Sequence, residues 1–407
     1  YSHEGERILD GSSGLFCCAA GHSRPEIAEA VYSQLKELSY VAPFQLAQPL
    51  SFELARRIAA LTPVGLDHVF FGNSGSEAVE TAVKIAYAYH YARGEGQRHR
   101  FVSRERAYHG VNLAGVSLSG MMKNRQAFGP GLPGVVHMRH TWLPENRFVK
   151  GQPETGMELA EDLERLAQQF GPDTIAACIV EPVAGSTGCL VPPKGYLQRL
   201  REICDDHGIV LIFDEVITGF RFAPGGAQEL LGITPDLSTF AKALGGGYPI
   251  AMVAGKKEHM SLLADGTAYH GGTMNSNMIS MAASKAVLLE LTKNDNAAYT
   301  RLYATGQALM EGFSTLASKH EVPMLVQGTG PVFALAFTDA AEITDYRSQA
   351  SLADHDKYRR FRRGMLEQGV RMKGSGVWFV STAHSDKDVR KTLDAADAVL
   401  AGPIGLD

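Results

Sequence analysis

The feature that most constrains the fold of this chain is a repeated alternation between short apolar segments and stretches with helical periodicity. Apolar runs of strand length lie at residues 68–71, 101–103, 174–180, 209–213, 237–241 and 252–254. Helical periodicity is found at residues 25–38, 51–61, 77–91, 196–207 and 277–292. Strands that alternate with crossover helices build a mostly parallel sheet that helices cover. The sequence therefore predicts an α/β fold.

The length of the chain and a change of texture near residue 300 predict two domains. A chain of 407 residues is too long for one small core. Beyond residue 300 a helical stretch is followed by a strand at 332–337, a helix at 354–368 and a strand at 377–381. This order is typical of a smaller α+β domain, which we expect the N-terminal residues to join. We predict a large domain over 44–295 and a small domain made of 1–43 and 296–407.

Charge, hydropathy and cysteine content exclude several classes of function. The net charge of −5 and the absence of a polybasic run predict no nucleic-acid partner and no membrane partner. The longest apolar runs are too short to span a bilayer. None of the five cysteines has metal-ligand spacing, so we expect no metal, and their odd number together with the lack of a signal-peptide pattern predicts a cytoplasmic protein. Adjacent Cys17 and Cys18 allow a redox pair, although packed small residues are the favoured interpretation.

Polar side chains follow the ends of several predicted strands. Glu181 follows the strand at 174–180, and Asp214 follows the strand at 209–213. Lys242 directly follows a third strand, and Tyr108 with His109 comes after a fourth. In a parallel sheet the ligand crevice lies outside the carboxyl ends of the strands. We therefore expect these side chains to share one site.

The turn Gly72-Asn73-Ser74-Gly75-Ser76 lies between a strand and a helix. Small residues allow the backbone to approach an anion, and the start of the helix presents unpaired N–H groups with the positive end of its dipole. A phosphate would fit there. The alternative is an ordinary helix start that a serine caps. The turn is not a nucleotide-binding P-loop, because no Gly-Lys-Ser/Thr closes it.

Asp214 and Lys242 are the two residues with the strongest chemical implications. A carboxylate at the end of an apolar strand needs a cationic partner, which is either a protonated pyridine nitrogen or an arginine such as Arg221. A desolvated lysine has a lowered pKa and acts as a nucleophile and then as a proton shuttle. The flat ring of Tyr108 suits the face of a flat cofactor.

These motifs together resemble the class III aminotransferases, which belong to fold type I of the pyridoxal-phosphate enzymes. The matching stretches are Asn73-Ser74-Gly75-Ser76-Glu77-Ala78, Tyr108-His109-Gly110, Glu181-Pro182-Val183, Asp214-Glu215-Val216, Ala241-Lys242-Ala243-Leu244-Gly245-Gly246-Gly247 and Gly272-Thr273. They follow the family order over nearly the whole chain. The resemblance implies a mostly parallel, seven-stranded sheet in the large domain, a smaller α+β domain, and pyridoxal 5'-phosphate as cofactor.

The resemblance also assigns a role to each matching residue. It implies that Ser74, Gly75 and Ser76 bind the phosphate, with Thr273 reaching it from the other subunit of a homodimer. Tyr108, next to His109, and Val216 would contact the two ring faces. Asp214 would pair with the pyridine nitrogen, with Glu181 nearby, and Lys242 would carry the cofactor as a Schiff base. Catalysis would then depend on Lys242, Asp214 and Tyr108.

Two branches of the family are similar to different parts of the chain. The stretch from Ser13 through Ser186 resembles omega-amino acid:pyruvate aminotransferases, whereas 219–228 and 379–384 resemble glutamate-semialdehyde aminomutase. We therefore expect an aminotransferase that moves an amino group from an omega-amino acid or amine to a keto acid such as pyruvate. The alternatives are an aminomutase or racemase on the same scaffold, and a catalytically silent binding protein. Intact Lys242, Asp214 and Tyr108 argue against the last.

The substrate pocket is less constrained by these motifs. Ornithine- and aminobutyrate-type relatives carry a second glutamate where this chain has Ser186, so their substrates are not expected. The stretch 273–278 departs from the family's Thr-x-Ser-Gly-Asn-Pro, which predicts an unusual entrance on the dimer side. Phe16 and Phe44 are candidates for an aromatic pocket. The carboxylate-binding cation of the pyruvate-dependent group would be either Arg371 or Lys373.

Overall fold

A central sheet of seven strands organises the computed structural model, which describes residues 1–141, 152–185, 191–340 and 351–402. In spatial order the strands are β2 (His68–Gly72), β8 (Ala251–Gly255), β7 (Leu237–Phe240), β6 (Val210–Asp214), β5 (Ile175–Val180), β3 (Arg100–Arg104) and β4 (Val135–Met138). All neighbouring pairs are parallel except the two that involve β8. The predicted α/β fold with a mostly parallel sheet is confirmed.

The central strands β5 and β6 are buried, and they are apolar up to Asp214 at the end of β6, because helices cover both faces of the sheet. In β6, Val210 and Ile212 point into one hydrophobic cluster, whereas Leu211 and Phe213 point into another. The first cluster contains side chains of α4 (Gly75–Ala92), α5 (Leu113–Leu118) and α10 (Lys257–Ala264). The second contains side chains of α7 (Glu161–Phe170) and α8 (Tyr196–His207). The alternation of side chains along each strand therefore ties the sheet to both helical layers.

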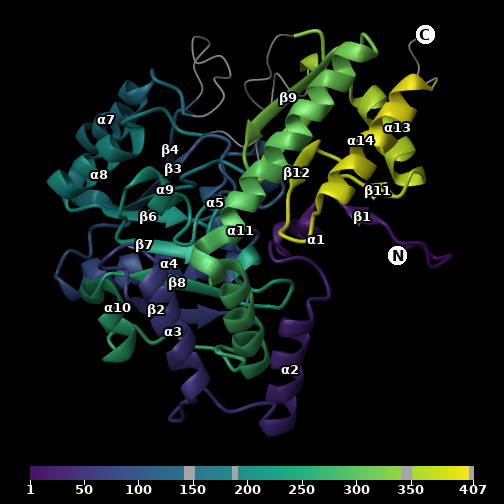
Figure 1. Cartoon of the computed structure of the whole chain (residues 1–407). Coiled ribbons are helices and arrows are strands. Elements are labelled where there is room, and N and C mark those ends of the chain that lie inside the picture. Colours follow the sequence, from purple (N-terminus) through teal and green to yellow (C-terminus); the bar gives the residue numbers. More distant parts are fainter. Residues whose placement is uncertain (142–151, 186–190, 341–350, 403–407) are drawn as a thin grey trace.

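The C-terminal residues form two smaller sheets, one of them together with the N-terminal segment. β10 (Val332–Phe337) lies between β9 (Met324–Thr329) and β12 (Val377–Phe379), antiparallel to both. β1 (Leu9–Asp10) pairs in parallel with β11 (Val370–Arg371), so that a strand near the start of the chain lies beside one from its C-terminal part (Figure 1). α13 (His355–Glu367) and α14 (Asp386–Ala401) pack against each other beside these strands. This arrangement is the expected smaller α+β part.

The long helix α11 (Met278–Lys319) runs from beside the central sheet to the C-terminal elements (Figure 1). Its backbone leaves the helical conformation from Lys293 to Asn296, where the predicted domain boundary falls. One hydrophobic cluster nevertheless contains Phe240 from the sheet region as well as Phe361 and Leu400 from the C-terminal helices. The division into 44–295 and 1–43 with 296–407 therefore stays a prediction.

Several short elements were not predicted from the sequence. They are the strands β1, β4, β9 and β11 and the helices α1 (Ser13–Phe16), α5, α6 (Met122–Arg125), α7, α9 (Ala227–Leu231) and α10, together with the longer helix α14. α2 (Pro25–Glu37) and α3 (Pro49–Leu61) were predicted. The strand predicted at 377–381 ends at Phe379, where its pairing with β10 ends. None of the described helices is both long enough and apolar enough to cross a membrane.

Candidate active site

A cavity of about 400 Å³ lies at the carboxyl ends of the parallel strands. It brings together most of the candidate residues from the sequence: Ser74, Gly75, Ser76, Tyr108, His109, Glu181, Asp214, Val216 and Lys242. Thr273, Phe16, Phe44, Arg371 and Lys373 do not line it. The strand ends and the first turn of α4 thus converge as the topology predicts.

The wall of the cavity at the start of α4 is shaped to accept an anion. Ser74 caps the helix, because its Oγ accepts a hydrogen bond from the backbone N–H of Glu77 at 3.2 Å. A Cβ atom on Gly75 would lie 2.8 Å from Cγ1 of Val216, so only glycine fits there. Ser76 Oγ accepts from the backbone N–H of Val111 at 3.0 Å. The helix is thus capped in the ordinary way and still presents its N-terminal N–H groups at the cavity.

Asp214, the last residue of β6, is buried and held by three donors. Its Oδ2 lies 2.8 Å from Nδ1 of His109, which donates because a carboxylate only accepts. Its Oδ1 accepts from the backbone N–H of Val216 at 3.1 Å and from Oγ1 of Thr239 at 3.2 Å. These bonds fix the direction in which the carboxylate faces the cavity.

The alternative ion pair between Asp214 and Arg221 is wrong. The buried guanidinium of Arg221 donates instead to the carbonyl oxygens of Val380 at 2.9 Å and Phe16 at 3.0 Å. The sequence placed the two residues seven positions apart, but the loop after β6 turns Arg221 toward the C-terminal strands. His109 takes the place beside the carboxylate, and its cofactor-binding role stays a prediction.

Lys242 follows β7 and begins a short 3₁₀ turn, Lys242–Leu244, with a positive φ of 43°. Burial lowers the pKa of its ammonium group, while the charges of Asp214 and Glu181 act in the opposite direction. A lysine with a lowered pKa has a larger fraction of neutral amine, which is the nucleophilic form. Its location and its pKa both suit a nucleophile.

Glu181, at the end of β5, supports the segment that carries Tyr108. Its Oε1 accepts a hydrogen bond from the backbone N–H of Tyr108 at 3.0 Å. Arg104 donates to the carbonyl oxygen of Glu181 at 2.9 Å. Burial raises the pKa of the Glu181 carboxyl group. Glu181 therefore positions Tyr108 at the wall of the cavity.

The candidate substrate residues lie in three different places. Lys373 Nζ lies 4.0 Å from the ring centroid of Phe16, and that ring stacks on Phe379. Burial, followed by the positive charge of Lys242, lowers the pKa of Lys373 to about 8. Lys373 and Lys242 are therefore within electrostatic reach of each other.

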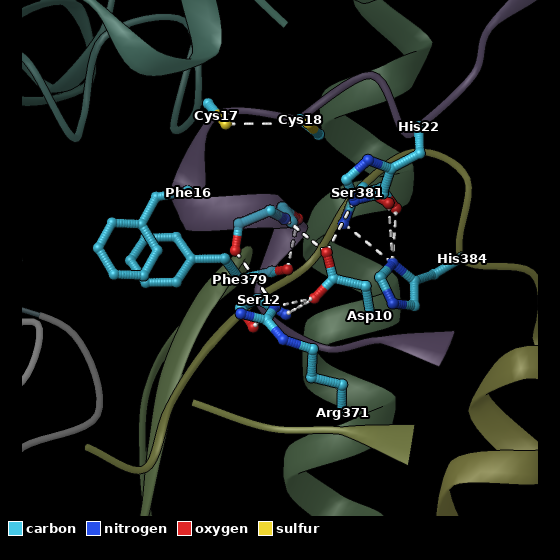
Figure 2. A network of polar contacts seen from close by, with 12 residues as sticks. Asp10, Ser12, Phe16, Cys17, Cys18, His22, Arg371, Phe379, Ser381 and His384 are labelled. Atoms are coloured by element: carbon cyan, nitrogen blue, oxygen red, sulfur yellow. Dashed lines mark hydrogen bonds and ion pairs between the residues drawn. The ribbon is translucent and has the colours of Figure 1, made fainter. Parts of the chain in front are cut away.

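Arg371 and Phe44 contact other parts of the chain than Lys373 and Phe16 do. Figure 2 shows Arg371 against the N-terminal segment, where its Nη1 lies 2.8 Å from Asp10 Oδ1 and 2.8 Å from Ser12 Oγ. Phe44 lines a separate hollow together with Gly271 and Asn275. Neither residue contributes to the cavity of its own chain.

Sequence reasoning missed several residues of the site. Leu15, Cys17, Asn73 and the segment Tyr248–Ile250 line the cavity. Cys17 is half-buried at the cavity wall, whereas Cys18 is buried, so the interpretation of the two as packed small residues stays a prediction. Thr239 reaches Asp214 because the two are paired in register on neighbouring strands, which the strand order alone reveals. Ser186 lies outside the described residues.

The residues present fit pyridoxal phosphate. The start of α4 suits its phosphate, Asp214 suits its ring nitrogen, and Lys242 suits its aldehyde carbon. Tyr108 offers a flat ring and Val216 an apolar surface for the two faces of the pyridine ring. Each chemical feature of the cofactor thus has a complementary group in one cavity.

Comparison with known proteins leads to the same family. The class-III aminotransferase family model matches residues 1–395. The chain is 50% identical over 300 residues to the omega-aminotransferase of Caulobacter vibrioides, covering 72% of this chain and 68% of that protein. It is 46% identical over 303 residues to the beta-alanine–pyruvate aminotransferase of Pseudomonas aeruginosa, covering 72% of this chain and 67% of that protein.

Solved structures of transaminases superimpose on nearly the whole chain. The (S)-enantioselective omega-transaminase of Thermomicrobium roseum has a TM-score of 0.85 at 31% identity, covering 98% of this chain and 89% of that one. An amine transaminase from an uncultivated Pseudomonas species, in its form with bound pyridoxal phosphate, has a TM-score of 0.86 at 29% identity, covering 98% and 91%. These relatives favour a transaminase over the aminomutase alternative. The chain therefore belongs to the class-III aminotransferases and is a transaminase whose cofactor is pyridoxal phosphate.

Proposed function

We propose that this transaminase takes its amino group from an omega-amino acid or amine and transfers it to a keto acid such as pyruvate. The named relatives include a beta-alanine–pyruvate and an omega-amino acid–pyruvate aminotransferase. The observation that carries the proposal is the half-buried ammonium group of Lys373 near Lys242, with no ion pair to any residue in the described part of the chain. An omega-amino acid has its carboxylate at the end opposite the reacting nitrogen, and such a cation suits it.

Each residue of the cavity would have its own role in the reaction. The bound cofactor supplies an electron sink for the carbon that carries the amino group. Asp214 would keep the ring nitrogen of the bound cofactor protonated, and His109, Thr239 and the Val216 N–H hold Asp214 in place. Lys242 would accept the proton from that carbon and donate it again later in the same half-reaction. Tyr108 and Val216 would contact the two faces of the cofactor ring.

A single-donor experiment tests this reaction. Enzyme mixed with an omega-amino acid alone should complete one half-reaction and stop, because the nitrogen stays on the cofactor until a keto acid accepts it. Addition of pyruvate should restart turnover and form alanine, which absorbance and chromatography detect. Sustained conversion of the donor without any acceptor would contradict the proposal and favour an aminomutase. Failure of pyruvate alone, with another keto acid active, would overturn only the choice of acceptor.

We further propose that Lys373, rather than Arg371, binds the substrate carboxylate. Arg371 is already held by Asp10 and Ser12, whereas Lys373 lies near the reacting lysine. Lys373→Ala should raise the KM for pyruvate roughly 10- to 100-fold, the loss of one charge-assisted hydrogen bond. Arg371→Ala is the matched control and should have a smaller effect. A larger effect of Arg371→Ala would reverse the assignment.

The pKa of Lys373 gives this proposal a pH dependence. As the pH rises through about 8, Lys373 loses its proton and the KM for pyruvate should rise. Lys373→Arg should keep its charge over this range and show a flatter KM profile, because arginine stays protonated. The same rise in the arginine variant would show that another group titrates.

The protein should act as a homodimer with each subunit completing the site of its partner. Thr273 and Phe44 lie outside the cavity of their own subunit, which leaves them available to the cavity of a second subunit. Exposed apolar side chains flank Thr273, among them Tyr269 and Met274, and the exposed Phe44 lies beside Gly271. An isologous interface would cover both copies of this surface.

Light scattering combined with activity assays tests the dimer. Thr273→Ala should weaken cofactor binding about tenfold, the loss of one hydrogen bond to a charged phosphate. The exposed Thr267→Ala serves as control on the same loop. A fully active monomer would contradict the proposal.

A cytoplasmic location stays a prediction from the cysteine content, which cell fractionation would test.

A further inference from the structure

Two neighbouring thiols stand at the wall of the cavity. Cys17 ends helix α1 and lines the cavity together with Lys242, whereas Cys18 is buried behind it. Their Sγ atoms are 3.8 Å apart, and Figure 2 shows them side by side. Cys18 Sγ also lies 3.8 Å from the carbonyl oxygen of Gly246 in the glycine run after Lys242. The pair therefore joins the N-terminal segment to the loop that carries the reactive lysine.

The surroundings favour a thiolate at this pair. A hydrogen bond from Cys18, assisted by the positive charge of Arg221, lowers the pKa of Cys17 to about 5. The pKa of Cys18 is raised, because the same hydrogen bond and burial favour its protonated form. Within the described part of the chain, the hydrogen bonds of the Arg221 guanidinium go to two carbonyl oxygens, and its buried Nε has no partner. Arg221 thus brings a positive charge close to the sulfurs that no carboxylate in that part of the chain neutralises.

We propose that Cys17 and Cys18 form a vicinal dithiol site that binds a trivalent arsenical and so closes the cavity wall to substrate. One arsenic atom bonds to both sulfurs, so the separation of 3.8 Å needs little adjustment. With phenylarsine oxide, two S–As bonds form and the arsenic–oxygen double bond breaks. The oxygen leaves as one water molecule, which takes one proton from the Cys18 thiol and one from the solvent, because Cys17 is a thiolate. The arsenic stays trivalent, so no oxidant or reductant is needed.

A disulfide between the same residues is the poorer product. Its sulfurs would have to approach to about 2.05 Å, and the Cα atoms of usual disulfides are about 4.4–6.8 Å apart. Adjacent residues hold their Cα atoms only about 3.8 Å apart. A vicinal disulfide would therefore be strained, whereas a bridging atom spans the gap.

A second thiol pair in the same chain provides an internal comparison. Cys178 and Cys204 are fully buried in the cluster between β5, β6 and α8, and a hydrogen bond links them. They have no contact with the cavity. Like Cys17 and Cys18, they are two thiols linked by a hydrogen bond. Because they are buried away from the cavity, the arsenical should not react with them in the folded protein. Cys189 lies outside the described residues, and Cys189→Ser removes it from the experiment.

The test titrates the holoenzyme with phenylarsine oxide and counts adducts by intact-protein mass spectrometry. The Cys189→Ser protein should bind one equivalent, resist excess glutathione and release the arsenical to 2,3-dimercaptopropanol. When Cys17→Ser or Cys18→Ser is introduced into this variant, its affinity for the arsenical should fall about 100-fold, because the second S–As bond forms intramolecularly. Addition of Cys204→Ser should leave binding unchanged. Wild-type affinity in both the Cys17 and Cys18 variants would overturn the site.

Activity provides a separate measurement. Each protein is compared with its own untreated activity, so that a direct effect of the substitution is removed from the comparison. The arsenical should abolish turnover where the pair is intact and spare it in Cys17→Ser. If the arsenical bound at Cys17 and Cys18 and the enzyme kept full activity, the proposed closure of the cavity would be wrong, whereas the binding site would stand. The mass measurement needs no substrate, so it holds even if the proposed donor and acceptor are wrong.

Discussion

Lys242→Ala should lower turnover by at least about 10⁴-fold, because the nucleophile and the proton-transfer group are removed together. The variant should still fold and bind pyridoxal phosphate, since the start of α4, Asp214 and Tyr108 remain in the cavity. Reduction with borohydride followed by mass spectrometry should find covalently attached cofactor in the wild type and none in the variant. Steady-state assays with an omega-amino acid and pyruvate measure the loss of turnover.

The control for this substitution is a lysine on the surface. In the described part of the chain the Lys194 side chain forms an exposed ion pair with Glu154, and Lys194→Ala should keep normal activity. Near-normal turnover in Lys242→Ala, or cofactor still covalently attached to that variant, would refute the assignment of Lys242. A variant that fails to bind cofactor at all would show that the covalent link also contributes most of the affinity.

Asp214→Asn should lower the rate of each half-reaction roughly 10²- to 10⁴-fold, the loss of about 3–5 kcal/mol when one partner of a buried charge pair is removed. A neutral amide cannot hold a proton on the pyridine nitrogen, so the ring loses its capacity as an electron sink. The fold should be preserved, because the amide oxygen can still accept from the Val216 N–H and Thr239. Rapid-mixing absorbance measurements with donor alone isolate one half-reaction.

Thr239→Val is the graded control for the same carboxylate. It removes one of three donors to Asp214 and leaves the charge in place, so a loss of about tenfold is expected. Wild-type half-reaction rates in Asp214→Asn would refute the electron-sink role. Equal losses in both variants would show that orientation rather than charge governs the contribution of Asp214.

The sequence by itself determined the class of fold and the strand ends that carry Asp214, Glu181 and Lys242. This was possible because the buried strands β5 and β6 are apolar over their whole length, so each carboxylate that follows marks a strand end. The turn before α4 was equally readable, because its small residues and its capping serine are local features. Family resemblance then gave these positions their cofactor.

Only the tertiary structure decided which groups meet across the chain. The partly buried strand β4 and the two-residue strands β1 and β11 have too little apolar pattern to be recognised, and they form because a distant strand pairs with them. Strand order and loop direction place His109, rather than Arg221, beside Asp214. They also place Thr239 on the neighbouring strand, within reach of the same carboxylate. The pairing of β1 with β11 places Arg371 against Asp10. The same pairing brings Lys373 within electrostatic reach of Lys242. Local sequence records the periodicity of an element, whereas long-range packing fixes the partners of each side chain.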